Sequence, residues 1–192
     1  MMKACILLGN TREKSNTETV SRVFADELSA NGVEVRFFKL REMSIHPCVG
    51  CETCHSIPES FGCVLKDDMG EIAEAVLASD LLVLTSPIYS WLPTPSLKAV
   101  MDRLFAFTKY PEDAEQFSLM KKQKIALIAT SADECAENCD LLDEAVSRLA
   151  RFSGLQYLGY FAAQDKGYEY ITGKEVESGA RAFARNCIEN RS

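Results

Sequence analysis

Short apolar runs alternate along the chain with segments whose apolar residues repeat at the spacing of one helix face. This alternation constrains the fold more than any other feature. Five runs predict strands, at residues 3–8, 33–37, 81–85, 124–130 and 155–161. A helical segment follows each run, and the clearest begins at Thr94-Pro95, an N-cap followed by proline at the first helical position. Nearly continuous apolar strands joined by helices predict an α/β fold, a doubly wound five-stranded parallel sheet in a three-layer α/β/α arrangement.

Length and charge narrow the class of protein. The chain has 192 residues, of which 47% are hydrophobic, so we expect a single domain over 1–192. Lys and Arg total 21 against 28 Asp and Glu, and the net charge of −7 predicts that nucleic acid is not a partner. No apolar run approaches the roughly 20 residues that cross a bilayer, and the run at 4–8 is too short for a signal peptide. We therefore expect a cytoplasmic protein without a membrane partner.

The loop after the first strand has the composition of a phosphate site. Its polar candidates are Asn10, Thr11, Arg12, Ser15, Asn16 and Thr17. They precede a predicted helix, whose N-terminal N–H groups and macrodipole favour an anion. The loop lacks G-x-G-x-x-G and the NTPase phosphate motif, so a monophosphate fits better than a dinucleotide. The alternative is an ordinary polar loop in which Ser15 or Asn16 caps the helix.

The loop after the third strand, residues 86–93, carries Tyr89 and the single tryptophan, Trp91. Ligands of such sheets bind beyond the carboxyl ends of the strands. Two aromatic side chains there predict a surface for a flat heteroaromatic ring. Ordinary packing of the two rings is the alternative.

A cysteine-rich insertion occupies residues 41–67. Four of the eight cysteines lie within it, at Cys48, Cys51, Cys54 and Cys63. Thiolates at two-residue intervals with a fourth nearby are typical of a [4Fe–4S] cluster, although eight residues separate Cys54 from Cys63. Zinc is an alternative because both histidines, His46 and His55, flank the cysteines. Free or redox-active thiols are the third interpretation.

The remaining candidates have structural explanations. Asp68 is expected to cap the helix that follows it. A solvated helix face with a local ion pair is expected for Lys98, Asp102 and Arg103. Core or peripheral positions are expected for Cys5, Cys135, Cys139 and Cys187. No hydrolytic constellation is visible and no catalytic side chain stands out, so the chemistry is expected to come from a cofactor.

Three motifs together resemble the flavodoxin-like NAD(P)H-dependent FMN reductases. They are G-x-x-R-x-x-S-N-T from Gly9, S-P-I-Y from Ser86, and L-K-x-x-x-D-R from Leu97. With the cysteine segment, the chain looks like the iron–sulfur flavoprotein branch of this family. The resemblance implies a sheet order of 2-1-3-4-5 and a homodimer or homotetramer. It also implies FMN, with its phosphate on the first loop and its ring along Pro87, Ile88, Tyr89, Ser90 and Trp91. The loop after the fourth strand, with Thr130, Ser131 and Ala132, would approach the other side of the ring.

These patterns predict an FMN-dependent oxidoreductase. It would move electrons from NAD(P)H or a reduced carrier to a small acceptor such as a flavin, a quinone or a one-electron carrier, with a [4Fe–4S] cluster as a second centre. The alternatives are a non-enzymatic electron carrier and a zinc-stapled binding module. Because the cysteine insertion follows the second strand, we expect its cysteines at the same sheet edge as the flavin.

Overall fold

The computed structural model describes residues 1–111, 115–120 and 122–189. Its centre is a parallel sheet of the order β2-β1-β3-β6-β7. The bounds are β1 Lys3–Leu8, β2 Glu34–Lys39, β3 Leu81–Pro87, β6 Lys124–Ser131 and β7 Gln156–Gln164. The predicted α/β class and order are confirmed, since these are the first to fifth long strands along the chain. A short antiparallel pair, β4 Thr108–Lys109 with β5 Phe117–Ser118, was not predicted.

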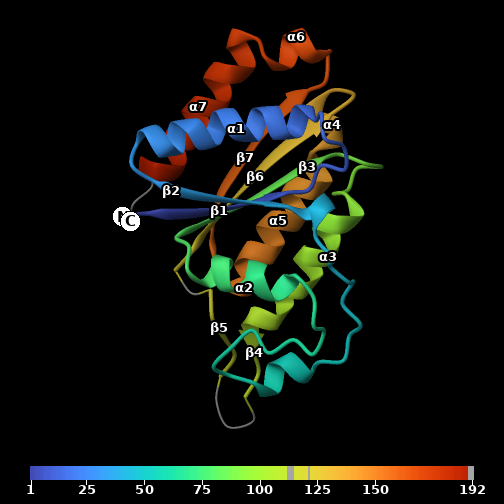
Figure 1. The fold of residues 1–192 in the computed structure, drawn as a ribbon, viewed down its shortest axis with the longest axis vertical. Coiled ribbons are helices and arrows are strands. Elements are labelled where there is room, and N and C mark those ends of the chain that lie inside the picture. Colours follow the sequence, from blue (N-terminus) through green and yellow to red (C-terminus); the bar gives the residue numbers. More distant parts are fainter. Residues whose placement is uncertain (112–114, 121, 190–192) are drawn as a thin grey trace.

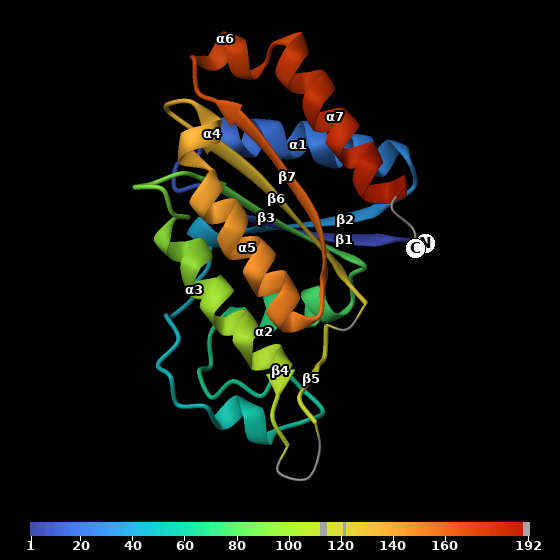
Figure 2. The same ribbon diagram turned by 180° about the vertical axis from the view of Figure 1, so that it is seen from behind.

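Helices cover both faces of the sheet (Figures 1 and 2). One layer contains α1 Asn16–Ala30, α6 Tyr168–Ile171 and α7 Lys174–Glu189. The other contains α2 Met69–Leu77, α3 Pro95–Leu104 and α5 Asp140–Ser153, with α4 Cys135–Asn138 just before α5. Among the described residues, no helix is both long and apolar enough to span a membrane.

The two layers explain why the strands are apolar throughout. In β1, Cys5 and Leu7 belong to the core beneath α2, α3 and α5, whereas Ile6 and Leu8 belong to the core beneath α1 and α7. Alternate residues of a strand point to opposite faces, so a sheet covered on both sides buries all of them.

Local signals in the sequence position the helix ends. Ser15 is the N-cap of α1, with its side chain accepting from Glu18 N–H. Thr94 caps α3, and its hydroxyl also donates to the carbonyl oxygen of Gly9 at 2.7 Å. Gly9 is required here, because a Cβ would lie 2.6 Å from the Thr85 oxygen. The ends of β1 and β3 are thereby held against the start of α3.

The predicted capping role of Asp68 is wrong. Its carboxylate makes no cap hydrogen bond to α2 and instead accepts from Ser44 N–H at 2.7 Å. Asp67 Oδ1 accepts from Met69 N–H at the start of α2. Both neighbouring carboxylates therefore hold the insertion and α2 together, which residue spacing alone does not reveal.

The insertion runs from the end of β2 alongside α3 to the far end of the molecule, near β4 (Figures 1 and 2). It contains two short 3-10 turns, η1 Leu40–Glu42 and η2 Thr53–Ser56. A third turn, η3 Phe105–Phe107, connects α3 to β4.

Candidate functional site

A pocket of about 110 Å³ lies where β1, β3 and β6 end, and we call it the strand-end pocket. Eleven of the fourteen residues predicted for the cofactor line it: Thr11, Arg12, Ser15, Asn16, Thr17, Pro87, Ile88, Tyr89, Thr130, Ser131 and Ala132. Asp165, just after β7, also lines the pocket and was missed. Its position at the end of the fifth strand was the available signal, because ligands gather at that edge.

Hydrogen bonds between loops connect the walls of this pocket. Thr17 Oγ1 lies 2.6 Å from Thr130 Oγ1, and Thr11 Oγ1 lies 2.8 Å from the Tyr89 hydroxyl. Ile88 N–H donates to the carbonyl oxygen of Thr130 at 2.8 Å. The three loops are therefore joined to one another by the chain's own polar groups.

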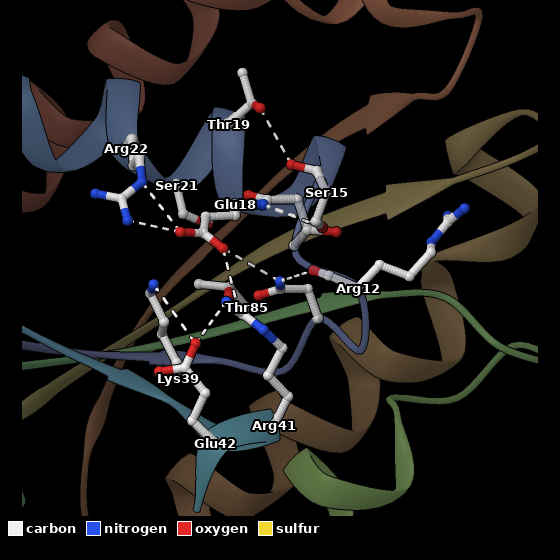
Figure 3. Close-up of polar contacts among 12 residues, drawn as sticks. Arg12, Ser15, Glu18, Thr19, Ser21, Arg22, Lys39, Arg41, Glu42 and Thr85 are labelled. Atoms are coloured by element: carbon white, nitrogen blue, oxygen red, sulfur yellow. Dashed lines mark hydrogen bonds and ion pairs between the residues drawn. The ribbon is translucent and has the colours of Figure 1, made fainter.

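The first turn of α1 and the Arg12 guanidinium supply positive charge to the pocket. Figure 3 shows Arg12 directed away from the neighbouring ion pairs. Helix N-termini present unpaired N–H groups and the positive end of the macrodipole. The arrangement is suited to an anion such as a phosphate.

Asn10 does not line the pocket, although the sequence predicted it among the cofactor residues. It is 1% exposed, and its side-chain amide donates to the Arg12 carbonyl at 2.8 Å and to Glu18 at 3.3 Å. Asn10 therefore shapes the loop from behind.

Glu18 anchors this support through two arginines (Figure 3). Arg22 binds one carboxylate oxygen at 2.6 Å, and Arg41 reaches the other at 3.3 Å. Burial would raise the pKa of Glu18, but the hydrogen bond and charge of Arg22, with the charges of Lys39 and Arg41, hold it below its ordinary value. The carboxylate thus stays ionised and joins the first loop to the start of the insertion.

Ser90 and Trp91 also lie outside the pocket lining. Tyr89 and Leu92 exchange backbone hydrogen bonds of 2.9 and 3.1 Å, which makes residues 89–92 a tight hairpin. Ser90 and Trp91 have φ of 49° and 64°, as a two-residue type I′ turn requires. Trp91 lies in this turn and is 54% exposed.

A second cavity, of about 90 Å³, is lined by all four cysteines of the insertion, and we call it the cysteine cavity. Cys48 and Cys51 are exposed, whereas Cys54 and Cys63 are half-buried. Its opposite wall is the end of α3 and the following turn, with Asp102, Arg103, Phe105 and Ala106. Tertiary structure therefore brings the four predicted ligands to one place.

Arg103 is not the solvated residue that the sequence predicted. It is 1% exposed, donates to Asp67 at 2.6 Å and to the His46 carbonyl at 3.3 Å, and lies 3.4 Å from Cys63 Sγ through Nη2. Burial would raise the pKa of Asp67, but hydrogen bonds from Arg103 and His46 lower it to about 2. The expected local pair is correct only for Lys98 and Asp102, which are exposed and 2.6 Å apart.

Lys109 is a second buried cation beside the cysteine cavity, and sequence reasoning missed it. It is 0% exposed, and its ammonium donates to the carbonyl oxygens of Cys54 at 2.8 Å and Phe61 at 3.4 Å. It belongs to β4, a strand too short to leave a periodic signal.

The donor set of the cavity distinguishes between the two metal hypotheses. Within the described ranges, no three His, Cys, Asp or Glu side chains converge on a point that one metal ion could occupy. His46 is turned to Asp67, and His55 Nδ1 contacts the Thr108 carbonyl at 2.7 Å. A zinc ion needs ligands converging on one centre, whereas the thiolates of an iron–sulfur cluster bind different iron atoms. Four thiols around one cavity, beside two cations, fit the anionic cluster better.

The two sites lie at opposite ends of α3. The N-cap Thr94 belongs to the strand-end region, while the cysteine cavity contacts Asp102 to Ala106. A helix of 10 residues is about 15 Å long. The expectation of cysteines at the flavin edge is therefore wrong, because the insertion leaves that edge and follows α3 to its far end.

Several known proteins are similar to this chain. The family model of NADPH-dependent FMN reductase matches residues 2–143. An iron–sulfur flavoprotein of Archaeoglobus fulgidus is 34% identical over 110 residues, which are 57% of this chain and 49% of that protein. The chain thus matches about half the length of this relative.

Two further similarities extend over nearly the whole chain. An FMN-dependent NADPH-azoreductase of Staphylococcus aureus is 27% identical over 97% of this chain and 94% of its own. The NAD(P)H:quinone oxidoreductase structure from Methanothermobacter marburgensis superposes with a TM-score of 0.70 at 19% identity, covering 96% of this chain and 98% of that chain. The structural likeness shows the shared fold.

Proposed function

Since the chain belongs to the NADPH-dependent FMN reductase family, as its sequence motifs predicted, we propose that it is an FMN-dependent oxidoreductase. The observation that carries this proposal is the strand-end pocket, where residues from three separate loops surround the N-terminal end of α1. The donor would be NAD(P)H or a reduced carrier, and the acceptor a flavin, a quinone or a one-electron carrier.

Each wall of the pocket has a role in this proposal. Arg12, Ser15 and the first turn of α1 would hold the FMN phosphate, while Pro87, Ile88 and Tyr89 would lie along the ring. Thr130, Ser131 and Ala132 would close its other side. Bound FMN supplies hydride and single-electron chemistry, and the protein supplies binding and orientation.

The test is a titration of apoprotein with FMN and with FAD, followed by anaerobic mixing of the FMN form with NADH or NADPH. We expect one FMN to bind per chain. One equivalent of NADH or NADPH per bound FMN should abolish the flavin absorbance. Tighter binding of FAD would contradict the proposed pocket. If neither NADH nor NADPH reduces the bound flavin and a reduced ferredoxin-type carrier does, the donor is the carrier.

We also propose that Cys48, Cys51, Cys54 and Cys63 hold a [4Fe–4S] cluster, which supplies one-electron transfer when bound. Each single Cys→Ser variant at these positions should lose most of its iron after anaerobic reconstitution. Cys135→Ser is the matched control and should keep it, because Cys135 lies outside the cysteine cavity. Zinc in place of iron, or a Cys63→Ser variant with full iron content, would refute this ligand set.

A further inference from the structure

Two cations lie beside the residues of the cysteine cavity, and both are withdrawn from water. Arg103 and Lys109 are 1% and 0% exposed. Arg103 approaches Cys63 Sγ at 3.4 Å, and Lys109 donates to the backbone of Cys54 at 2.8 Å. One buried cation therefore lies beside the Cys63 thiol, and the other binds the backbone of Cys54.

The two cations are not balanced equally. Asp67 pairs with Arg103 at 2.6 Å, and its own side chain is 2% exposed. No carboxylate in the described part of the chain forms an ion pair with Lys109, whose ammonium has only carbonyl oxygens as partners. Moving an ammonium out of water is costly unless negative charge compensates it. Within the described part of the chain, the charge of Lys109 is therefore not compensated by an ion pair, and an anionic occupant of the cavity would compensate it.

We propose that Arg103 and Lys109 set the reduction potential of the iron–sulfur cluster held by the four cysteines. This inference rests on the proposed cluster. Adding an electron makes the cluster more negative, so a nearby buried positive charge stabilises its reduced state more than its oxidised state. A hydrogen bond from Arg103 to the Cys63 sulfur acts in the same direction, as hydrogen bonds to cluster sulfurs do.

The experiment is a redox titration of reconstituted protein, with the cluster followed by electron paramagnetic resonance and the flavin by absorbance. Lys109→Gln removes the positive charge of Lys109 and keeps a donor for the Cys54 carbonyl. Arg103→Lys keeps the charge and shortens the side chain that reaches Cys63. In an Arg103→Gln/Asp67→Asn double variant, both charges of the buried pair are removed together, so neither remains uncompensated. Arg148→Gln, in an exposed pair with Glu144, is the matched control.

We expect Lys109→Gln to reduce the cluster at a more negative potential. At a fixed potential its reduced-to-oxidised ratio should fall about tenfold, which for a one-electron couple corresponds to about 59 mV. Arg103→Lys should shift the cluster potential in the same direction by a smaller amount. The flavin potential should stay unchanged in these variants, and the cluster potential should stay unchanged in Arg148→Gln. Only charged groups beside the cysteine cavity change the local field at the cluster.

The outcomes separate this inference from the proposed function. Wild-type protein that takes up no iron would overturn both the proposed cluster and the role of the two cations, and would leave the proposed FMN site to its own test. Normal iron content with an unchanged cluster potential in Lys109→Gln and Arg103→Lys would overturn only the role of the two cations. An equal shift in Arg148→Gln would also overturn it, since net charge rather than position would then set the potential.

Discussion

Arg12 is the cation among the residues that line the strand-end pocket, and in the described part of the chain its guanidinium forms no ion pair, whereas the nearby Arg22 is bound to Glu18. We predict that Arg12→Ala weakens FMN binding by roughly 1.5–3 kcal/mol, the contribution of a charge-assisted hydrogen bond. The dissociation constant should therefore rise roughly ten- to hundredfold, as measured by fluorescence titration of apoprotein. Lys14→Ala is the control, because Lys14 is nearby but outside the pocket lining. Equal weakening by both variants would show that only general charge matters.

Asp67 shows how one buried residue links stability to pH. Its pKa falls from 3.8 to about 2 on folding, so its ionised form contributes stability above about pH 4 that is lost as the pH drops toward 2. The shift corresponds to about 2 kcal/mol. We predict that the free energy of unfolding of the wild-type apoprotein, measured in urea, falls as the pH drops from about 4 toward 2. In Asp67→Asn it should fall less over the same pH range. Asp102→Asn, which removes a carboxylate of an exposed ion pair, should keep the wild-type pH dependence of the free energy of unfolding.

At the scale of elements, α3 connects the two candidate sites, while the 89–92 hairpin projects from one of them. Thr94 at the start of α3 donates a hydrogen bond to the first loop, at Gly9. Arg103 at the end of α3 binds the insertion through Asp67. The hairpin stores strain, because left-handed backbone costs roughly 1–2 kcal/mol for a residue with a side chain.

The hairpin strain gives a stability prediction. The double variant Ser90→Asn/Trp91→Gly places the residues preferred by a type I′ turn at its two positive-φ positions. We expect the free energy of unfolding to increase by about 1 kcal/mol or more in urea denaturation. The control is Ser178→Asn, a substitution on exposed helix surface in α7. A less stable hairpin variant would contradict the turn geometry.

At the scale of the whole molecule, we propose a homodimer or homotetramer whose interface includes the exposed apolar side chains of the hairpin. Trp91 and Leu92 are 54% and 50% exposed beside the strand-end pocket. Sedimentation velocity should give a mass of two or four times 21.3 kDa. Leu92→Asp should shift it toward the monomer, since a charge buried at an interface is costly. Leu141→Asp, equally exposed on α5, should not. A wild-type monomer would contradict this arrangement.

Much of the fold and of the strand-end pocket followed from local sequence chemistry. Apolar alternation predicted the long strands, and Ser15 and Thr94 marked the starts of two helices. Because parallel strands bring their carboxyl ends to one edge, loops far apart in sequence could be predicted to form one site. Asn10, Ser90 and Trp91 do not line that pocket, since the position of a side chain depends on the turn around it, and their contact with a cofactor stays a prediction.

Sequence by itself determined that four cysteines would be near neighbours, because their spacing keeps them close along the chain. Only the tertiary structure decided where they lie and what surrounds them. The long insertion follows α3 to its far end, where Arg103 and Lys109 are buried against it. Sequence patterns report interactions over one or two turns, whereas the burial of a cation depends on segments dozens of residues away. Asp67, Cys54 and Phe61 provide those distant partners, and packing of the insertion against α3 and β4 brings them into place.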